Sequence, residues 1–164
     1  MVHIREAAKR DLDAIVLLWK QLMQFHTDLD PVFRLNPAAE KIFRKFITKC
    51  VRSRSVLTLV AEEDEKIVAF CNTTVEMNPP VFHPGRFGMI SDLVVDAGYR
   101  RRGIGTRLVE TVKLWLLKQG IRSVRLRAAT VNPVAVSFWR SRGFKDIIVT
   151  LSQEITTSGA PEGE

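Results

Sequence analysis

Few cysteines and no long apolar run are the first features of this 164-residue sequence. No apolar stretch approaches the about 20 residues that a membrane-spanning helix needs, and no signal-peptide pattern opens the chain. The two cysteines, Cys50 and Cys71, stand in core-like surroundings without a partner at metal-ligand spacing. We therefore expect no membrane span, no metal site, two buried reduced thiols and a cytoplasmic protein.

The best-known phosphate-binding motifs are also missing. No Gly-x-x-x-x-Gly-Lys-Ser/Thr segment occurs, which excludes a P-loop. Gly103 and Gly105 form a Gly-x-Gly pair, but Leu108 stands where a dinucleotide-binding fingerprint has its third glycine. The pair also lies in the middle of the chain, whereas a dinucleotide-binding fold carries its fingerprint after the first strand. These two nucleotide-binding folds are therefore excluded.

Positive charge is in excess, with 25 lysines and arginines against 18 acidic residues and a net charge of +7. Such an excess favours a polyanionic partner, either a nucleic acid or a phosphorylated cofactor. Many of the basic residues gather near the Gly-x-Gly pair, and no helix-turn-helix or aromatic RNA-binding strand motif is present. A phosphorylated cofactor explains the charge, and we expect no nucleic-acid partner.

The stretch 89–119 predicts a strand, a tight turn and a helix. Residues 89–95 are mostly apolar and end in β-branched side chains, which is typical of a buried strand. Apolar residues then recur on one face of a helix, namely Leu108, Val109, Val112, Trp115 and Leu116. The glycines in the turn let a ligand approach the backbone, and the unpaired N–H groups of the first helical turn favour a diphosphate.

This turn resembles the acyl-CoA-binding signature of the GNAT N-acetyltransferases. Arg100-x-x-Gly103-x-Gly105 follows a strand that ends in Leu93-Val94-Val95, as the family's Gln/Arg-x-x-Gly-x-Gly/Ala motif does. A second segment, from Asn132 to Phe144, is similar to the family's Asn-x-x-Ala-x-x-Phe/Leu-Tyr-x-x-x-Gly-Phe motif. The resemblance implies an α+β GNAT fold over residues 1–155, with a mixed central sheet whose parallel strands splay apart between helices. Residues 156–164 are expected to be a flexible tail.

The remaining elements follow from periodicity and turn residues. We expect strands at residues 2–6, 56–61, 66–76, 124–129 and 145–153, with 62–65 as a hairpin turn and 78–88 as a loop. A helix begins at residue 11 and its apolar stripe ends at His26, before a break over residues 27–36. A second helix begins at Pro37 with Asn36 as its cap, and buries Ile42, Phe43, Phe46, Ile47 and Cys50. Pro133 opens a short helix that ends near Gly143.

The resemblance implies acetyl-CoA as acyl donor and a set of residues that bind it. The set comprises Arg100, Arg101, Arg102, Gly103, Ile104, Gly105 and Thr106 at the phosphates, Leu93, Val94 and Val95 along the pantetheine, and Asn132, Phe138 and Trp139 from the second segment. The pantetheine would lie between the splayed strands, and an N–H of Val94 or Val95 would stabilise the tetrahedral oxyanion. Asn132 has a second interpretation, as the cap of the helix that Pro133 begins.

Two carboxylates are candidates for the base that takes a proton from the acceptor amine. Asp92 is nearest to the proposed gap and Glu76 lies on the neighbouring strand. Asp92 could equally be a structural carboxylate that accepts backbone hydrogen bonds. Trp139 replaces the tyrosine that serves as acid in this family, and an indole N–H is no usable acid, so solvent is expected to protonate the thiolate.

The acceptor remains an amine of unspecified kind, either a small molecule or an amine of a peptide or protein. His26, Asp28, Asp30 and Phe33 fall in the turn that commonly lines the acceptor pocket of the family, and His83 falls in the proline-rich loop. A satisfied core histidine is the alternative for His26. A covalent acyl-cysteine mechanism is disfavoured because neither cysteine is in a motif. A module that binds acyl-CoA without catalysis is the alternative function. The sequence leaves the oligomeric state open, with a homodimer as one option because exposed final strands often mediate pairing.

Overall fold

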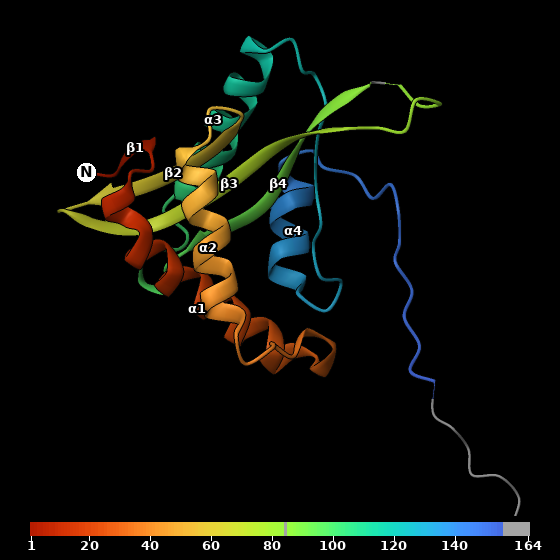
Figure 1. The fold of residues 1–164 in the computed structure, drawn as a ribbon, viewed down its shortest axis with the longest axis horizontal. Helices are drawn as coiled ribbons and strands as arrows, with labels where there is room; N and C mark the ends of the chain where they lie inside the picture. Colours follow the sequence, from red (N-terminus) through yellow and green to blue (C-terminus); the bar gives the residue numbers. More distant parts are fainter. Residues whose placement is uncertain (84, 156–164) are drawn as a thin grey trace, which may run out of the picture.

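A computed structural model describes residues 1–83 and 85–155, and its centre is a five-stranded mixed sheet (Figure 1). The strands are β1 (His3–Glu6), β2 (Val56–Glu63), β3 (Lys66–Met77), β4 (Arg86–Val95) and β5 (Val124–Leu126), and they lie in this order across the sheet. The helices are α1 (Leu12–Leu29), α2 (Ala39–Arg52), α3 (Ile104–Lys118) and α4 (Pro133–Ser141). Pairing is antiparallel from β1 to β4, and β5 is parallel to β4.

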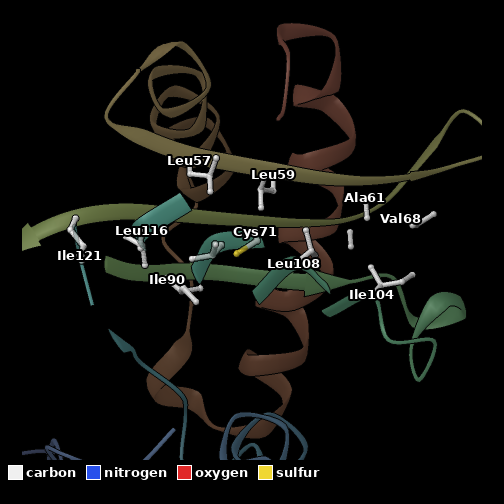
Figure 2. Close-up of a cluster of buried hydrophobic side chains, with 12 residues drawn as sticks. Leu57, Leu59, Ala61, Val68, Cys71, Ile90, Ile104, Leu108, Leu116 and Ile121 are labelled. Atoms are coloured by element: carbon white, nitrogen blue, oxygen red, sulfur yellow. The ribbon is translucent and has the colours of Figure 1, made fainter. Parts of the chain in front are cut away.

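Helices cover both faces of the sheet. We call the face under α1 and α2 the α1/α2 face; there Trp19 stacks on Phe43 at 4.2 Å, and both pack against Phe70 of β3. The opposite face, under α3, is the α3 face, where Leu108 of α3 packs against Cys71 of β3 (Figure 2). Alternate residues of each strand point to opposite faces, which explains why adjacent residues belong to different cores. The central strands β2 and β3 are consequently buried on both faces over most of their length, whereas β1 and β5 are only partly buried.

The parallel strands β4 and β5 separate after a short pairing. Only three residue pairs are in register, Gly88 with Val124, Met89 with Arg125 and Ile90 with Leu126. Strand β5 ends there, whereas β4 continues to Val95. Beyond Ile90, β4 has β3 on one edge and no strand among the described residues on the other. The splayed arrangement that the resemblance implied is therefore present.

Gly88 allows α3 to lie close to the paired part of β4. A Cβ at this position would stand 2.4 Å from Cδ1 and 2.7 Å from Cδ2 of Leu116. We expect Gly88→Ala to lower the free energy of unfolding by about 1–3 kcal/mol, because Leu116 must leave its rotamer or α3 must shift. Urea unfolding measures this loss, with Gly85→Ala as control because a Cβ there meets nothing within 4 Å. Equal urea midpoints for the two variants would contradict the prediction.

The expected strand over residues 145–153 was wrong. No strand forms there within the described part of the chain, and Ile147, Ile148 and Val149 are 66–79% exposed. β-branched residues favour a strand only where a neighbouring strand supplies hydrogen bonds and a packed face. The segment has neither. Residues 156–164, the expected flexible tail, lie outside the described residues.

Several element boundaries also differ from expectation. Helix α1 continues to Leu29, β4 begins at Arg86 inside the expected loop, and β5 ends at Leu126. Helix α2 begins at Ala39, because the Asn36 side chain accepts a hydrogen bond from the Ala38 N–H at 2.8 Å and forms a turn before the helix.

The buried face of α2 is narrower than its periodicity indicated. Phe43, Ile47 and Cys50 are buried as expected, but Ile42 is 58% exposed and Phe46 42% exposed. The α1/α2 face contacts a single stripe of this amphipathic helix, so the apolar residues beside the stripe face outward.

Candidate functional site

The turn between β4 and α3 leaves its backbone open. Gly103 is exposed and has φ 76°, and Arg101 is also left-handed with φ 63°. A Cβ on Gly103 would meet no heavy atom within 4 Å. The first helical hydrogen bond runs from Arg107 N to Gly103 O at 3.1 Å, so the N–H groups of residues 104–106 precede the intrahelical bonds. The turn therefore offers several backbone donors, with the positive end of the α3 dipole behind them.

The arginines before the turn are held by different partners. Arg102 donates to Glu63 Oε1 at 2.8 Å and lies over the Tyr99 ring at 5.2 Å. The pKa of the Glu63 carboxyl is lowered by this hydrogen bond. Arg100 donates from Nε to the carbonyl of Val95 at 3.2 Å, at the end of the free part of β4. These contacts hold two guanidinium groups beside the turn and one of them already has a carboxylate partner.

Helix α4 packs directly against this turn. A Cβ on Gly105 would stand 3.3 Å from Phe138 Cζ and 3.6 Å from Leu93 Cδ2, so glycine lets the Phe138 ring approach α3. Trp139 makes edge contacts with Phe138 at 4.9 Å and with Phe144 at 5.1 Å. The two segments singled out in the sequence are thus brought together, and α4 lies alongside the free part of β4 (Figure 1).

A β-bulge in β4 directs Asp92 to the α1/α2 face. Asn72 of β3 pairs with Asp92 and Thr73 pairs with Ile90, so Ser91 is the extra residue. Ile90 and Leu93 both pack in the α3-face core, which leaves Ser91 and Asp92 together on the other face. The Ser91 hydroxyl and the Asn72 side-chain amide are 3.2 Å apart. The bulged residue, Ser91, is the first residue of β4 after the part that pairs with β5.

Burial raises the pKa of Asp92 to about 6, although a Ser91 hydrogen bond acts in the opposite direction. A carboxyl with such a pKa is ionised at neutral pH and is still basic enough to accept a proton, which suits a general base. Of the two candidate carboxylates, Asp92 is the one whose pKa is raised by burial, and its role as the base stays a prediction.

The comparisons with known proteins agree with this geometry. The sequence profile of the acetyltransferase (GNAT) family matches residues 19–144. The chain belongs to this family.

Individual relatives extend the match in sequence and in structure. The chain is 34% identical over 86 residues to human N-acetyltransferase 8, a match that covers 52% of this chain and 37% of that protein. It is 24% identical over 139 residues to the ribosomal protein bS18 alanine N-acetyltransferase of Escherichia coli K12, covering 81% of this chain and 85% of the relative. A predicted acetyltransferase from Clostridium acetobutylicum, solved with acetyl-CoA, has the same fold with a TM-score of 0.76, 20% identity and coverage of 94% and 96%. The comparisons support acetyl transfer to amines, and nothing in them supports a non-catalytic acyl-CoA-binding module.

Asn132 of this GNAT chain caps α4. Its Oδ1 accepts a hydrogen bond from the Ala135 N–H at 3.0 Å, and the residue is only 5% exposed. The capping interpretation is therefore confirmed. The contact with pantetheine stays a prediction, and it is compatible with the cap because the amide nitrogen of Asn132 takes no part in it.

Glu76 is on the same face of the sheet as Asp92 but further along β3. It pairs with Phe87, whereas Asn72 pairs with Asp92, so about 13 Å of strand separates the two positions. Glu76 is exposed, and Thr74 donates to it over 3.5 Å. The structure does not bring the two carboxylates together, so at most one of them can serve the same proton.

The two histidine-bearing segments also lie apart. His26 is near the end of α1, where its ring lies 5.3 Å from that of Phe33 and burial lowers its pKa. The loop between β3 and β4, which carries His83, lies on the opposite side of α4 from the α1–α2 connection (Figure 1). The two segments that carry these histidines are therefore separated in the fold, and their place in an acceptor pocket stays a prediction.

Both cysteines are buried free thiols, as expected. Burial raises the pKa of Cys71 to about 12 and also raises that of Cys50, so neither is a thiolate at neutral pH. Within the described residues there is no cluster of three or more potential metal ligands, and no helix is long and apolar enough to cross a membrane.

Proposed function

We propose that the chain transfers the acetyl group of acetyl-CoA directly to an amine, on a small molecule or on a peptide or protein. The observation that carries this proposal is the open Gly103 turn, which follows the part of β4 that β5 leaves unpaired. A diphosphate at the α3 amides would direct the pantetheine along the free edge of β4. The acetyl-CoA in the Clostridium acetobutylicum neighbour and the N-acetyltransferase relatives support the same donor and the same class of acceptor.

The proposed roles follow from position. Gly103, Ile104, Gly105 and Thr106 bind the diphosphate through backbone N–H groups, in the positive field of the neighbouring Arg100, Arg101 and Arg102. Leu93 and Val95 pair through their backbone with the pantetheine, while Phe138 and Trp139 pack against it. A backbone N–H of Val94 or Val95 stabilises the oxyanion that forms when the amine attacks the thioester carbonyl.

Asp92 is the proposed base. The amine must lose its proton to become a nucleophile, because an alkylammonium has a pKa of about 10.4 in water. The carboxylate of Asp92 accepts that proton, directly or through water, and the free amine attacks the thioester carbonyl to form the C–N bond. The tetrahedral intermediate loses the second amine proton to solvent and collapses with cleavage of the C–S bond. The CoA thiolate leaves and takes a proton from solvent, since Trp139 has no acidic group to offer.

A thiol-release screen tests the proposed function. Purified protein and acetyl-CoA are mixed with amino acids, polyamines, aminoglycosides and peptides that begin with alanine, and free CoA thiol is measured. We expect release that depends on at least one of these amines. Thermal stabilisation by acetyl-CoA without release from any amine would favour the non-catalytic module, and absence of stabilisation would contradict the acetyl-CoA site itself.

We also propose a homodimer in the cytoplasm. The dimer is supported by the exposed side chains of Ile147, Ile148 and Val149, which no described element covers. Light scattering during gel filtration tests it, and a mass of one chain at micromolar concentration would contradict it.

The two free thiols support a reducing compartment. Fractionation of the host cell tests that assignment, and recovery of the protein outside the cytoplasm would contradict it.

A further inference from the structure

Arg142 places a poorly compensated positive charge beside the α3 turn. Its Nη1 donates to Thr106 Oγ1 over a long 3.5 Å, and its Nε is buried without an acceptor among the described residues. A guanidinium is permanently charged and carries several N–H donors. Burying such donors without partners is unfavourable, and an anion bound beside Arg142 would supply the missing acceptor.

Two nearby arginines differ from Arg142 in having carboxylate partners, whereas Arg100 and Arg107 donate to the backbone carbonyls of Val95 and Val2. Arg140 pairs with Asp146 at 2.7 Å and Arg102 pairs with Glu63 at 2.8 Å. No ion pair among the described residues includes Arg142. Of the two arginines of α4 and its C-cap, Arg142 is therefore the one without a counter-ion in the described part of the chain.

The end of α4 holds Arg142 in this position. Gly143 has φ 86° and donates its N–H to Arg140 O at 3.0 Å, while Phe144 N donates to Trp139 O at 3.2 Å. This pattern is a Schellman C-cap, and the Phe144 ring lies 5.1 Å from that of Trp139, a hydrophobic contact that commonly accompanies the motif. Arg142 is the last residue before the glycine, so its backbone is determined by the cap while its side chain reaches α3.

We propose that Arg142 is a phosphate-binding residue that contacts the diphosphate of the acyl-CoA donor. This inference rests on the proposed function, because the diphosphate is placed at the N–H groups of residues 103–106. Thr106 lies in the first turn of α3, and its hydroxyl accepts the hydrogen bond from Arg142. A phosphate oxygen bound at this turn would therefore lie near the Arg142 guanidinium. The 3.5 Å hydrogen bond is weak enough to be exchanged for a shorter, charge-assisted one to the phosphate.

Binding of CoA and of 3′-dephospho-CoA by calorimetry tests the proposal. We expect Arg142→Gln to weaken both ligands by about 10- to 100-fold, the range for a charge-assisted hydrogen bond. Arg142→Lys, which keeps the charge without the fork of donors, should lose less affinity than Arg142→Gln. Arg140→Gln is the matched control on the same helix, 61% exposed and paired with Asp146, and should bind within about twofold of the wild type.

Urea unfolding without ligand separates a binding role from a structural one. Because Arg142 is half-buried and its buried Nε has no acceptor among the described residues, Arg142→Met should have the same urea midpoint as the wild type or a higher one. Unchanged CoA affinity in Arg142→Gln would overturn the proposal. So would a loss confined to CoA and absent with dephospho-CoA, because the contact would then be to the 3′-phosphate. A wild-type protein that binds neither ligand would instead contradict the proposed function.

Discussion

Gly103→Leu is expected to weaken acetyl-CoA binding by at least about 100-fold and to abolish activity at ordinary donor concentrations. Several charge-assisted hydrogen bonds between backbone N–H groups and the diphosphate contribute about 1.5–3 kcal/mol each, and a side chain at Gly103 displaces the phosphates from them. A Cβ on Gly103 meets no protein heavy atom within 4 Å, so the new side chain obstructs the ligand rather than the fold. Calorimetry with CoA measures the loss.

Gly120→Leu is the matched control for this variant. Gly120 follows the other end of α3, has φ 71° and is also free of heavy atoms within 4 Å of an added Cβ. Both substitutions force a side chain into the left-handed region and should lower stability by about 1–2 kcal/mol. Only Gly103→Leu should lose CoA affinity. If the two variants bind CoA equally well, the phosphates are not at this turn.

Asp92→Asn is expected to lower kcat/KM by about 10²–10⁴-fold, the usual contribution of positioned acid–base catalysis. In the wild type, kcat/KM should rise with pH as the Asp92 carboxyl ionises at about 6. That limb should vanish in the variant, leaving the rise that belongs to the acceptor amine itself. Profiles of kcat/KM between about pH 5 and pH 9 measure both effects. Glu76→Gln is the control for the second candidate carboxylate, and a larger loss in Glu76→Gln than in Asp92→Asn would reverse the assignment.

The same substitution should raise stability near neutral pH. The folded-state pKa of Asp92, about 6, is above the ordinary value of about 3.9, so the fold favours the neutral carboxyl. Its contribution to stability is complete below about pH 4 and is lost as the pH rises through about 6. Asparagine removes that loss, and we expect Asp92→Asn to be more stable by about 1–2 kcal/mol, allowing for partial solvent exposure. Lower stability of the variant in urea at neutral pH would indicate a structural carboxylate instead.

The largest error of the sequence interpretation concerns the end of the chain. Residues 145–153 have the composition of a strand, yet none forms in the described structure. Local propensity cannot tell whether a strand will find an edge to pair with, because the edge is made by residues far away in sequence. The same reason explains why β5, expected over residues 124–129, ends at Leu126, where its pairing with β4 stops.

By itself, the sequence determined the family, the order of most elements and the position of the turn that we propose as the donor site. These depend on short-range features, namely apolar periodicity, glycines at fixed spacing and capping residues such as Asn132. Only the tertiary structure decided how Asp92 and Arg142 are placed. The bulge at Ser91 turns Asp92 to the α1/α2 face and its burial raises the pKa, while the cap of α4 carries Arg142 to Thr106 of α3. Burial and charge compensation arise between elements distant in the chain, so no local pattern encodes them.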